Sequence, residues 1–202
     1  MLGHNEGVTR GLLIIDVQND FTEGGALGVA GGAAVAAGIT RMLAGSGERY
    51  DLVVASRDWH NADDDNGGHF AAAGAEPDFV TTWPVHCVAG TSGAEYHPAL
   101  DAGRVDVHIR KGQGVPAYSI YEGTSDDGAG LSDVLDAADV HELDVVGIAT
   151  DYCVRASALD ALSDGRDVRV LVDLVAGVSP DSSERALEEL RAAGATLARS
   201  DD

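Results

Sequence analysis

The chain has 202 residues, 45% of them hydrophobic, which suits a single globular domain over residues 1–202 with a full apolar core. Its formal net charge of -21 argues against nucleic acids and anionic membranes as partners, because their phosphates would repel it. No apolar run is long enough to span a membrane, and residues 1–7 lack the charged and apolar regions of a signal peptide. We therefore expect a cytoplasmic protein.

The 13 basic residues are twelve arginines and one lysine, Lys111. An acidic surface with so few lysines repels itself at low ionic strength, and dissolved salt screens that repulsion. The composition therefore predicts a protein that salt stabilises. The two cysteines, Cys87 and Cys153, are expected to be free thiols, since disulfides are rare in the cytoplasm.

Apolar runs of strand length alternate with helical patterns along the chain. The predicted strands cover residues 11–15, 52–56, 105–109, 143–148, 168–172 and 195–199. The predicted helices cover residues 33–43, 131–138, 153–165 and 179–191. This alternation indicates an α/β fold with one doubly wound parallel sheet of about six strands and helices on both faces.

Residues 147–155 place a thiol at a strand-to-helix junction, because the apolar run stops there, Cys153 follows and a helical pattern begins. The first turn of a helix has free N–H groups and a partial positive charge, which lower the pKa of a nearby thiol. The same N–H groups can hold the oxygen of a tetrahedral intermediate. The alternative is that Cys153 is a small apolar residue packed under the helix.

Charged side chains also stand at the ends of the first three predicted strands. Asp16 ends the first, Asp58 and His60 follow the second, and Lys111 ends the third. Because the carboxyl ends of parallel strands form one edge of a sheet, we expect these groups to converge near Cys153. Taken individually, Asp16 could be an ordinary turn residue, and Lys111 could be present by chance without a functional role. Together, an acid, an ammonium and a thiol indicate nucleophilic acyl chemistry.

A metal site is predicted beside this group. Asp58 and His60 are two residues apart, so in an extended segment they point to the same side. Carboxylate and imidazole suit zinc, iron or manganese, and His69 and His86 are the available further ligands. Cys87, next to His86, is a weaker candidate nucleophile than Cys153 because no helical pattern follows it.

These residues resemble the cysteine hydrolases of the isochorismatase-like superfamily and, within it, the nicotinamidases. The resemblance extends over nearly the whole chain. It is carried by residues 15–21, by Asp58-Trp59-His60, by Trp83-Pro84-Val85-His86-Cys87, by Lys111 and by residues 149–154.

The resemblance implies an isochorismatase-like fold and hydrolysis of nicotinamide to nicotinate and ammonia in NAD salvage, with pyrazinamide-type analogues as further substrates. It implies that Cys153 attacks the carboxamide to form a thioester, that Asp16 transfers the proton, and that Lys111 holds both groups electrostatically. The backbone N–H groups of Ala149 and Cys153 would form the oxyanion hole, next to a cis peptide between Ile148 and Ala149.

The resemblance further implies one divalent metal ion, with Zn²⁺ the first choice and Fe²⁺ or Mn²⁺ as alternatives. Its ligands would be Asp58, His60 and His86, and His69 is an additional candidate. The residues expected to line the substrate pocket are Phe21, Trp83, Tyr118 and Tyr152, the last with an open role.

Two other functions remain to be weighed. The first is an amidase of the same fold that acts on another small amide or carbamoyl compound, and does so without metal. The second is a non-catalytic binding protein, which would be expected to have lost the Asp–Lys–Cys set that is complete here. The sequence leaves open whether the chain forms homo-oligomers.

Overall fold

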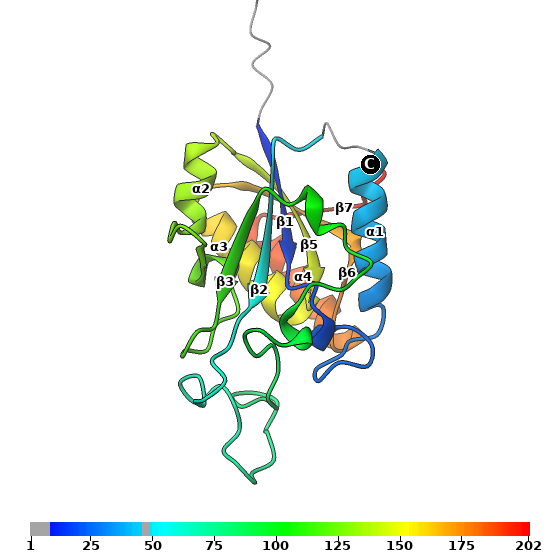
Figure 1. Cartoon of the computed structure of the whole chain (residues 1–202). Helices are drawn as coiled ribbons and strands as arrows, with labels where there is room; N and C mark the ends of the chain where they lie inside the picture. The colour runs from blue at the N-terminus through cyan, green and yellow to red at the C-terminus, as the bar shows by residue number, and fades with distance from the viewer. Residues whose placement is uncertain (1–8, 46–48) are drawn as a thin grey trace, which may run out of the picture.

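The computed structural model describes residues 9–45 and 49–202, whose strands form one seven-stranded sheet in the order β4-β3-β2-β1-β5-β6-β7 (Figure 1). Six strands run parallel to their neighbours, and β4 pairs antiparallel with β3. The strands are β1 (Arg10–Ile15), β2 (Leu52–Asp58), β3 (Val107–Lys111), β4 (Thr124–Ser125), β5 (Glu142–Ile148), β6 (Asp167–Ala176) and β7 (Thr196–Ala198). The predicted α/β sheet is confirmed, and β4, which sequence analysis missed, is too short to produce a pattern.

Helices cover both faces of the sheet, as predicted. Helix α1 (Gly32–Gly45) packs on one face, and α2 (Leu131–Ala137), α3 (Arg155–Ser163) and α4 (Pro180–Ala193) pack on the other. Short helical turns complete the described part of the chain: η1 (Asn19–Phe21), η2 (Ser92–Ala94), η3 (Ala102–Arg104), η4 (Ile120–Glu122) and the π-helical turn η5 (Thr150–Val154).

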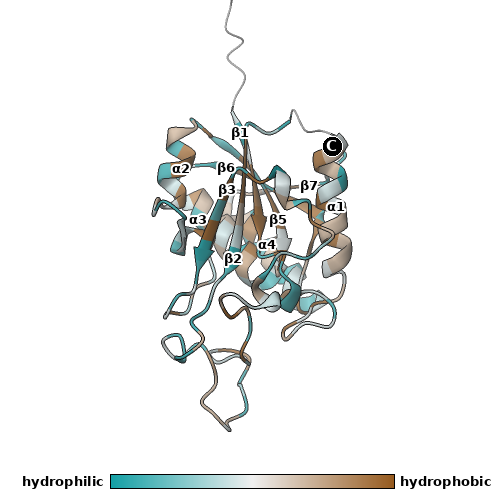
Figure 2. Cartoon of the chain, in the orientation of Figure 1, coloured by the Kyte–Doolittle hydropathy of each residue, from teal (hydrophilic) through white to brown (hydrophobic). Residues whose placement is uncertain are grey.

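The central strands are apolar on both sides because helices cover both sides. In β1, Leu12 and Ile14 join the core under α1, while Leu13 and Ile15 join the core under α2, α3 and α4. Figure 2 shows the hydrophobic colour concentrated in these central strands. A continuous apolar run, rather than an alternating one, is therefore the expected sequence of such a strand.

Two strands extend further toward their carboxyl ends than the sequence indicates. Strand β2 ends at Asp58 instead of residue 56, and β3 ends at Lys111 instead of residue 109. Asp58 and Lys111 are consequently register partners in neighbouring strands. Beyond this edge, the long loops of residues 59–90 extend below the sheet in Figure 1. Asp58, predicted to follow β2, and Lys111, predicted at the end of β3, are thus both held by the sheet itself.

None of the helices within residues 9–45 and 49–202 is both long and apolar enough to cross a membrane. The chain has a large excess of acidic groups, 34 Asp and Glu against 13 Lys and Arg.

Salt is expected to raise the melting temperature, because it screens repulsion among these acidic groups. Between 10 mM and 1 M sodium chloride we expect a rise of roughly 5 °C, corresponding to about 2 kcal/mol for a chain of this size. Differential scanning calorimetry measures it, with chloride as the anion because sulfate strengthens apolar burial directly. A flat or falling melting temperature would contradict the prediction.

Candidate active site

The predicted charged residues converge at the carboxyl edge of β1, β2, β3 and β5. Asp16 follows β1 directly, Asp58 and Lys111 end β2 and β3, and Cys153 lies in η5, just after β5. The Lys111 Nζ atom lies 2.9 Å from Asp16 Oδ2 and 3.9 Å from Cys153 Sγ, and it also contacts Asp58 Oδ1. The acid, the ammonium and the thiol expected to act together are therefore in contact through one lysine.

All members of this group are withdrawn from water. Lys111 and Asp16 are completely buried, and Cys153 is only 7% exposed. Burial opposes the charged form of Lys111, but the Asp16 and Asp58 carboxylates outweigh it and raise the lysine pKa well above its ordinary value. Burial raises the pKa of Asp16, and Lys111 offsets part of that rise. The two carboxylates thus favour the charged form of Lys111.

The predicted lowering of the Cys153 pKa is wrong. Burial raises the pKa of this thiol well above its ordinary value, and Lys111 counteracts only part of the effect. The regular helix α3 begins at Arg155, so Cys153 lies in the π-helical turn before it rather than in a first α-helical turn. The thiol therefore needs a base to become a nucleophile, and the neighbouring Asp16 carboxylate is placed to serve as one.

The turn carrying the thiol begins with the predicted cis peptide bond, between Ile148 and Ala149. Just before it, Gly147 has a φ of +122°, and a Cβ atom there would lie 2.1 Å from the carbonyl oxygen of Ile15. Only glycine permits this close approach of β5 to β1. Strand β1 and the turn that carries Cys153 are thereby held close together.

Two residues that hold Asp16 and Asp58 in place were not predicted as site residues. Ser56 Oγ donates a hydrogen bond to Asp16 Oδ1 at 2.7 Å. The Gln18 side chain accepts from the Asp58 N–H at 2.8 Å and donates to the Asp58 carbonyl at 2.9 Å. Gln18 lies within the motif of residues 15–21, but its partner is 40 residues away. Only the sheet reveals the contact.

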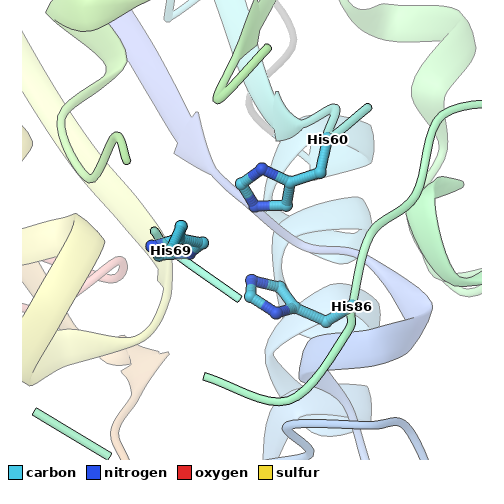
Figure 3. Close-up of side chains that lie close together, drawn as sticks. All are labelled: His60, His69 and His86. Atoms are coloured by element: carbon cyan, nitrogen blue, oxygen red, sulfur yellow. The ribbon is translucent and has the colours of Figure 1, made fainter. Parts of the chain in front are cut away.

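The histidines His60, His69 and His86 form one buried cluster, with candidate ligand atoms within 4.8 Å of one another (Figure 3). The Asp58 Oδ2 atom lies 3.5 Å from His60 Nε2 and 3.7 Å from His86 Nε2. The structure thus brings together the three predicted ligands, and it also places His69, which sequence analysis left open, among them.

Hydrogen bonds to backbone carbonyls orient two of the histidine rings as metal ligands require. His60 Nδ1 bonds the Gly112 carbonyl at 2.8 Å and His86 Nδ1 bonds the Pro84 carbonyl at 2.7 Å, which directs both Nε2 atoms inward. His60 Nε2 and His69 Nδ1 are buried without a hydrogen-bond partner. Burial, with His60 and His86 nearby, lowers the pKa of His69 to about 4, so its imidazole is neutral as a ligand must be. The donor set fits a divalent metal ion.

A cavity of about 560 Å³ opens above these groups. Its buried floor contains Asp58, His69, His86 and Cys153. Aromatic side chains form much of its wall, and Trp83 Nε1 donates to the Tyr118 hydroxyl at 3.0 Å. All four predicted pocket residues line it: Phe21, Trp83, Tyr118 and Tyr152. A flat aromatic ligand in this cavity would pack between the aromatic side chains and would contact both the thiol and the histidines.

Comparison with known proteins agrees with this geometry. The isochorismatase domain family matches residues 10–202. The nicotinamidase/pyrazinamidase of Mycobacterium tuberculosis is 49% identical over 188 residues, which cover 93% of this chain and 97% of that protein. The solved structure of the Pyrococcus horikoshii pyrazinamidase in complex with zinc has a TM-score of 0.79 at 37% identity, covering 94% and 98%. PnC1 from L. infantum in complex with nicotinate has a TM-score of 0.81 at 34% identity, covering 96% and 94%.

The chain therefore belongs to the isochorismatase family. Within that family, the proteins it resembles over nearly its full length are amide hydrolases named nicotinamidases or pyrazinamidases. The resemblance indicated by the sequence motifs is confirmed.

Proposed function

We propose that this chain is a metal-dependent nicotinamidase, which hydrolyses nicotinamide to nicotinate and ammonia. The observation that carries the proposal is the Asp58 carboxylate, whose Oδ1 contacts Lys111 and whose Oδ2 faces His60 and His86. One side chain thus joins a thiol site to a metal site. A pyridine carboxamide has the two matching groups, a carbonyl carbon for the thiol and a ring nitrogen for the metal.

In the first half-reaction, Cys153 Sγ attacks the carboxamide carbon while Asp16 accepts the thiol proton. The C–N bond then breaks, Asp16 gives the proton to the departing nitrogen, and ammonia leaves a thioester on Cys153. Water attacks the thioester as Asp16 takes one of its protons. The C–S bond breaks, the sulfur regains the proton through Asp16, and nicotinic acid is released, which ionises to nicotinate in water.

Neighbouring groups support these steps. Lys111 keeps Asp16 positioned and offsets negative charge as the thiolate develops, since its Nζ lies within 4 Å of both the carboxylate and the sulfur. The backbone N–H groups of Ala149 and Cys153 donate to the oxyanion of each tetrahedral intermediate. Phe21 and Trp83 hold the ring between them, Tyr118 bonds Trp83, and Tyr152 contacts Trp83 edge to face at 5.2 Å between ring centroids.

Asp58, His60 and His86, together with His69, would hold the metal ion. Zn²⁺ is the first choice and Fe²⁺ or Mn²⁺ are alternatives, since nitrogen and carboxylate donors suit all three. When bound, the ion supplies a Lewis-acid contact for the pyridine nitrogen. The name of the M. tuberculosis relative supports pyrazinamide-type analogues as further substrates. We place the enzyme in the cytoplasm, where nicotinate feeds NAD salvage.

Metal removal tests this proposal. Metal-replete protein is expected to release ammonia from nicotinamide, and exhaustive chelation is expected to lower kcat/KM by at least about 100-fold, with recovery on adding Zn²⁺. Emission spectroscopy should find one metal ion per chain, which is independent of turnover. No ammonia release by the metal-replete protein would contradict the nicotinamidase function. Full activity of the metal-free protein would favour the same-fold amidase of another small amide or carbamoyl compound.

A further inference from the structure

The mouth of the cavity is bordered by two large apolar side chains that are exposed to water. Phe79 is 53% exposed and Val178 is 59% exposed, yet both line the cavity whose floor holds the thiol and the histidines. They come from segments far apart in the sequence. We call this pair the apolar lip. Among the large apolar side chains that are exposed in the described part of the chain, these two are the ones that line the cavity, where a bound ligand would cover them.

The backbone at Phe79 is strained and firmly held. Its φ of +56° is rare for a bulky residue. The neighbouring Asp78 carboxylate accepts hydrogen bonds from the N–H groups of Val80, Thr81 and Thr82 at 2.8 to 2.9 Å, and from the Thr81 hydroxyl at 2.6 Å. Strain of this kind persists where the surroundings over-determine it, and it is common at ligand-contacting positions.

The turn presents the Phe79 ring to the aromatic wall of the cavity. The ring meets Trp83 edge to face, with 6.2 Å between centroids. Trp83 in turn bonds Tyr118, so the Phe79 ring continues the wall toward solvent.

Val178 is hydrogen-bonded to the turn that carries Cys153 rather than to the turn that carries Phe79. Its N–H donates to Asp151 Oδ1 at 3.0 Å, and Asp151 precedes Cys153 by two residues. The Asp151 carboxylate also accepts from the Ser182 hydroxyl, which anchors the segment at the start of α4. Both halves of the apolar lip therefore have defined positions relative to the reacting thiol.

The proposed function determines which part of the substrate faces the lip. In a pyridine-3-carboxamide, the ring nitrogen directed to the histidines and the carboxamide directed to Cys153 both face the buried floor. The C2 atom lies between them, so C5, on the opposite side of the ring, faces the mouth. The exposed cavity-lining residues at that mouth are apolar.

We propose that Phe79 and Val178 form an outer subsite that determines specificity at C5, and that the enzyme takes pyridine-3-carboxamides carrying a small apolar group there. The proposal rests on the nicotinamidase function proposed above. An alkyl group at C5 is removed from water when it contacts the lip, which favours binding. A polar group of similar size would lose its hydrogen bonds with water there, and neither side chain can replace them, which disfavours binding.

The test compares nicotinamide with its 5-methyl, 5-ethyl and 5-hydroxymethyl derivatives. For wild-type protein, kcat/KM is expected to rise about threefold for each added methylene, and to fall for the hydroxymethyl compound. In Phe79→Ala the gain should disappear, and in Phe79→Leu most of it should remain. Val178→Ser should likewise abolish the rise in kcat/KM with alkyl size. Asp78→Ala should have the same effect, because it removes the hydrogen bonds that hold the turn carrying Phe79.

The matched control is Val80→Ala. Val80 adjoins Phe79 and is 73% exposed, but it does not line the cavity, so this variant should keep the wild-type series. An unchanged alkyl preference in both Phe79→Ala and Val178→Ser would overturn the proposal. Calorimetric dissociation constants of the matching 5-alkyl nicotinates, measured on the same proteins, report on the lip without turnover. Failure of wild-type protein to hydrolyse nicotinamide would overturn the proposed function, while the calorimetric series would still decide whether the subsite exists.

Discussion

Cys153→Ala is expected to lower kcat for nicotinamide hydrolysis by at least about 10,000-fold, leaving only what the oxyanion hole and substrate binding contribute. The thiol lies on the cavity floor, 3.9 Å from the Lys111 ammonium, so no other group in the proposed mechanism can form the thioester. Ammonia release in single-turnover and steady-state assays measures the loss. Mass spectrometry of quenched wild-type enzyme should show an acyl adduct on the peptide containing Cys153.

Cys87 provides the matched control, because it is also a buried free thiol but does not line the cavity. Cys87→Ser should keep activity within about tenfold of wild type, since its sulfur makes only a long contact of 3.9 Å with the Gly93 carbonyl. The nucleophile assignment would be wrong if Cys87→Ser abolished turnover and Cys153→Ala did not.

Lys111→Met is expected to have the second-largest effect, on stability as well as activity. It leaves the Asp16 and Asp58 carboxylates facing each other without their shared cation, in a site with no exposure to water for Asp16. Removing one partner of a buried ionic group typically costs about 3–5 kcal/mol of unfolding free energy. Urea unfolding measures this cost, and kcat should fall by at least about 1000-fold because Asp16 loses its partner.

Lys111→Arg should also lose most activity, because a longer planar guanidinium does not fit a site built for a compact ammonium. The control is Arg110→Met, on the neighbouring residue of β3, whose side chain is 35% exposed and pairs with the exposed Asp126. Losing this surface pair and the contact of the Arg110 guanidinium with the Trp59 ring, at 4.9 Å, should cost about 1–2 kcal/mol and leave turnover intact. Near-normal kinetics of Lys111→Arg would exclude Lys111 from the mechanism.

Local sequence patterns identified the components of the site because each follows an apolar run. Asp16 and Lys111 stand at the ends of buried strands, and parallel strands bring their carboxyl ends to one edge. Asp58 and His60 were paired from their spacing alone, and the structure brings them within 3.5 Å. Such inferences succeed because they depend on the two-residue period of a strand and on the alternation of strands with helices, which makes neighbouring strands parallel, and both can be read along the sequence.

Contacts between distant segments were not accessible in the same way. Ser56 bonds the Asp16 carboxylate and Gln18 bonds the Asp58 backbone, each across 40 residues of chain. His69 reaches the cluster from a long loop whose path no pattern predicts. The error at Cys153 has the same origin. The helix-end pattern predicts a lowered pKa for the Cys153 thiol. The packing around the sulfur excludes water, and this burial raises the pKa instead.

The sequence by itself determined the α/β architecture, the edge of the sheet where the candidate site lies, and the thiol, the acid and the lysine that are proposed to act there. Only the tertiary structure decided that Asp58 is shared between Lys111 and the histidines, that burial raises the pKa of the Cys153 thiol, and that Phe79 and Val178 border the cavity mouth. The reason is physical: hydrophobic periodicity is encoded in neighbouring residues, whereas burial, charge pairing and cavity shape arise from segments that meet only in the folded chain.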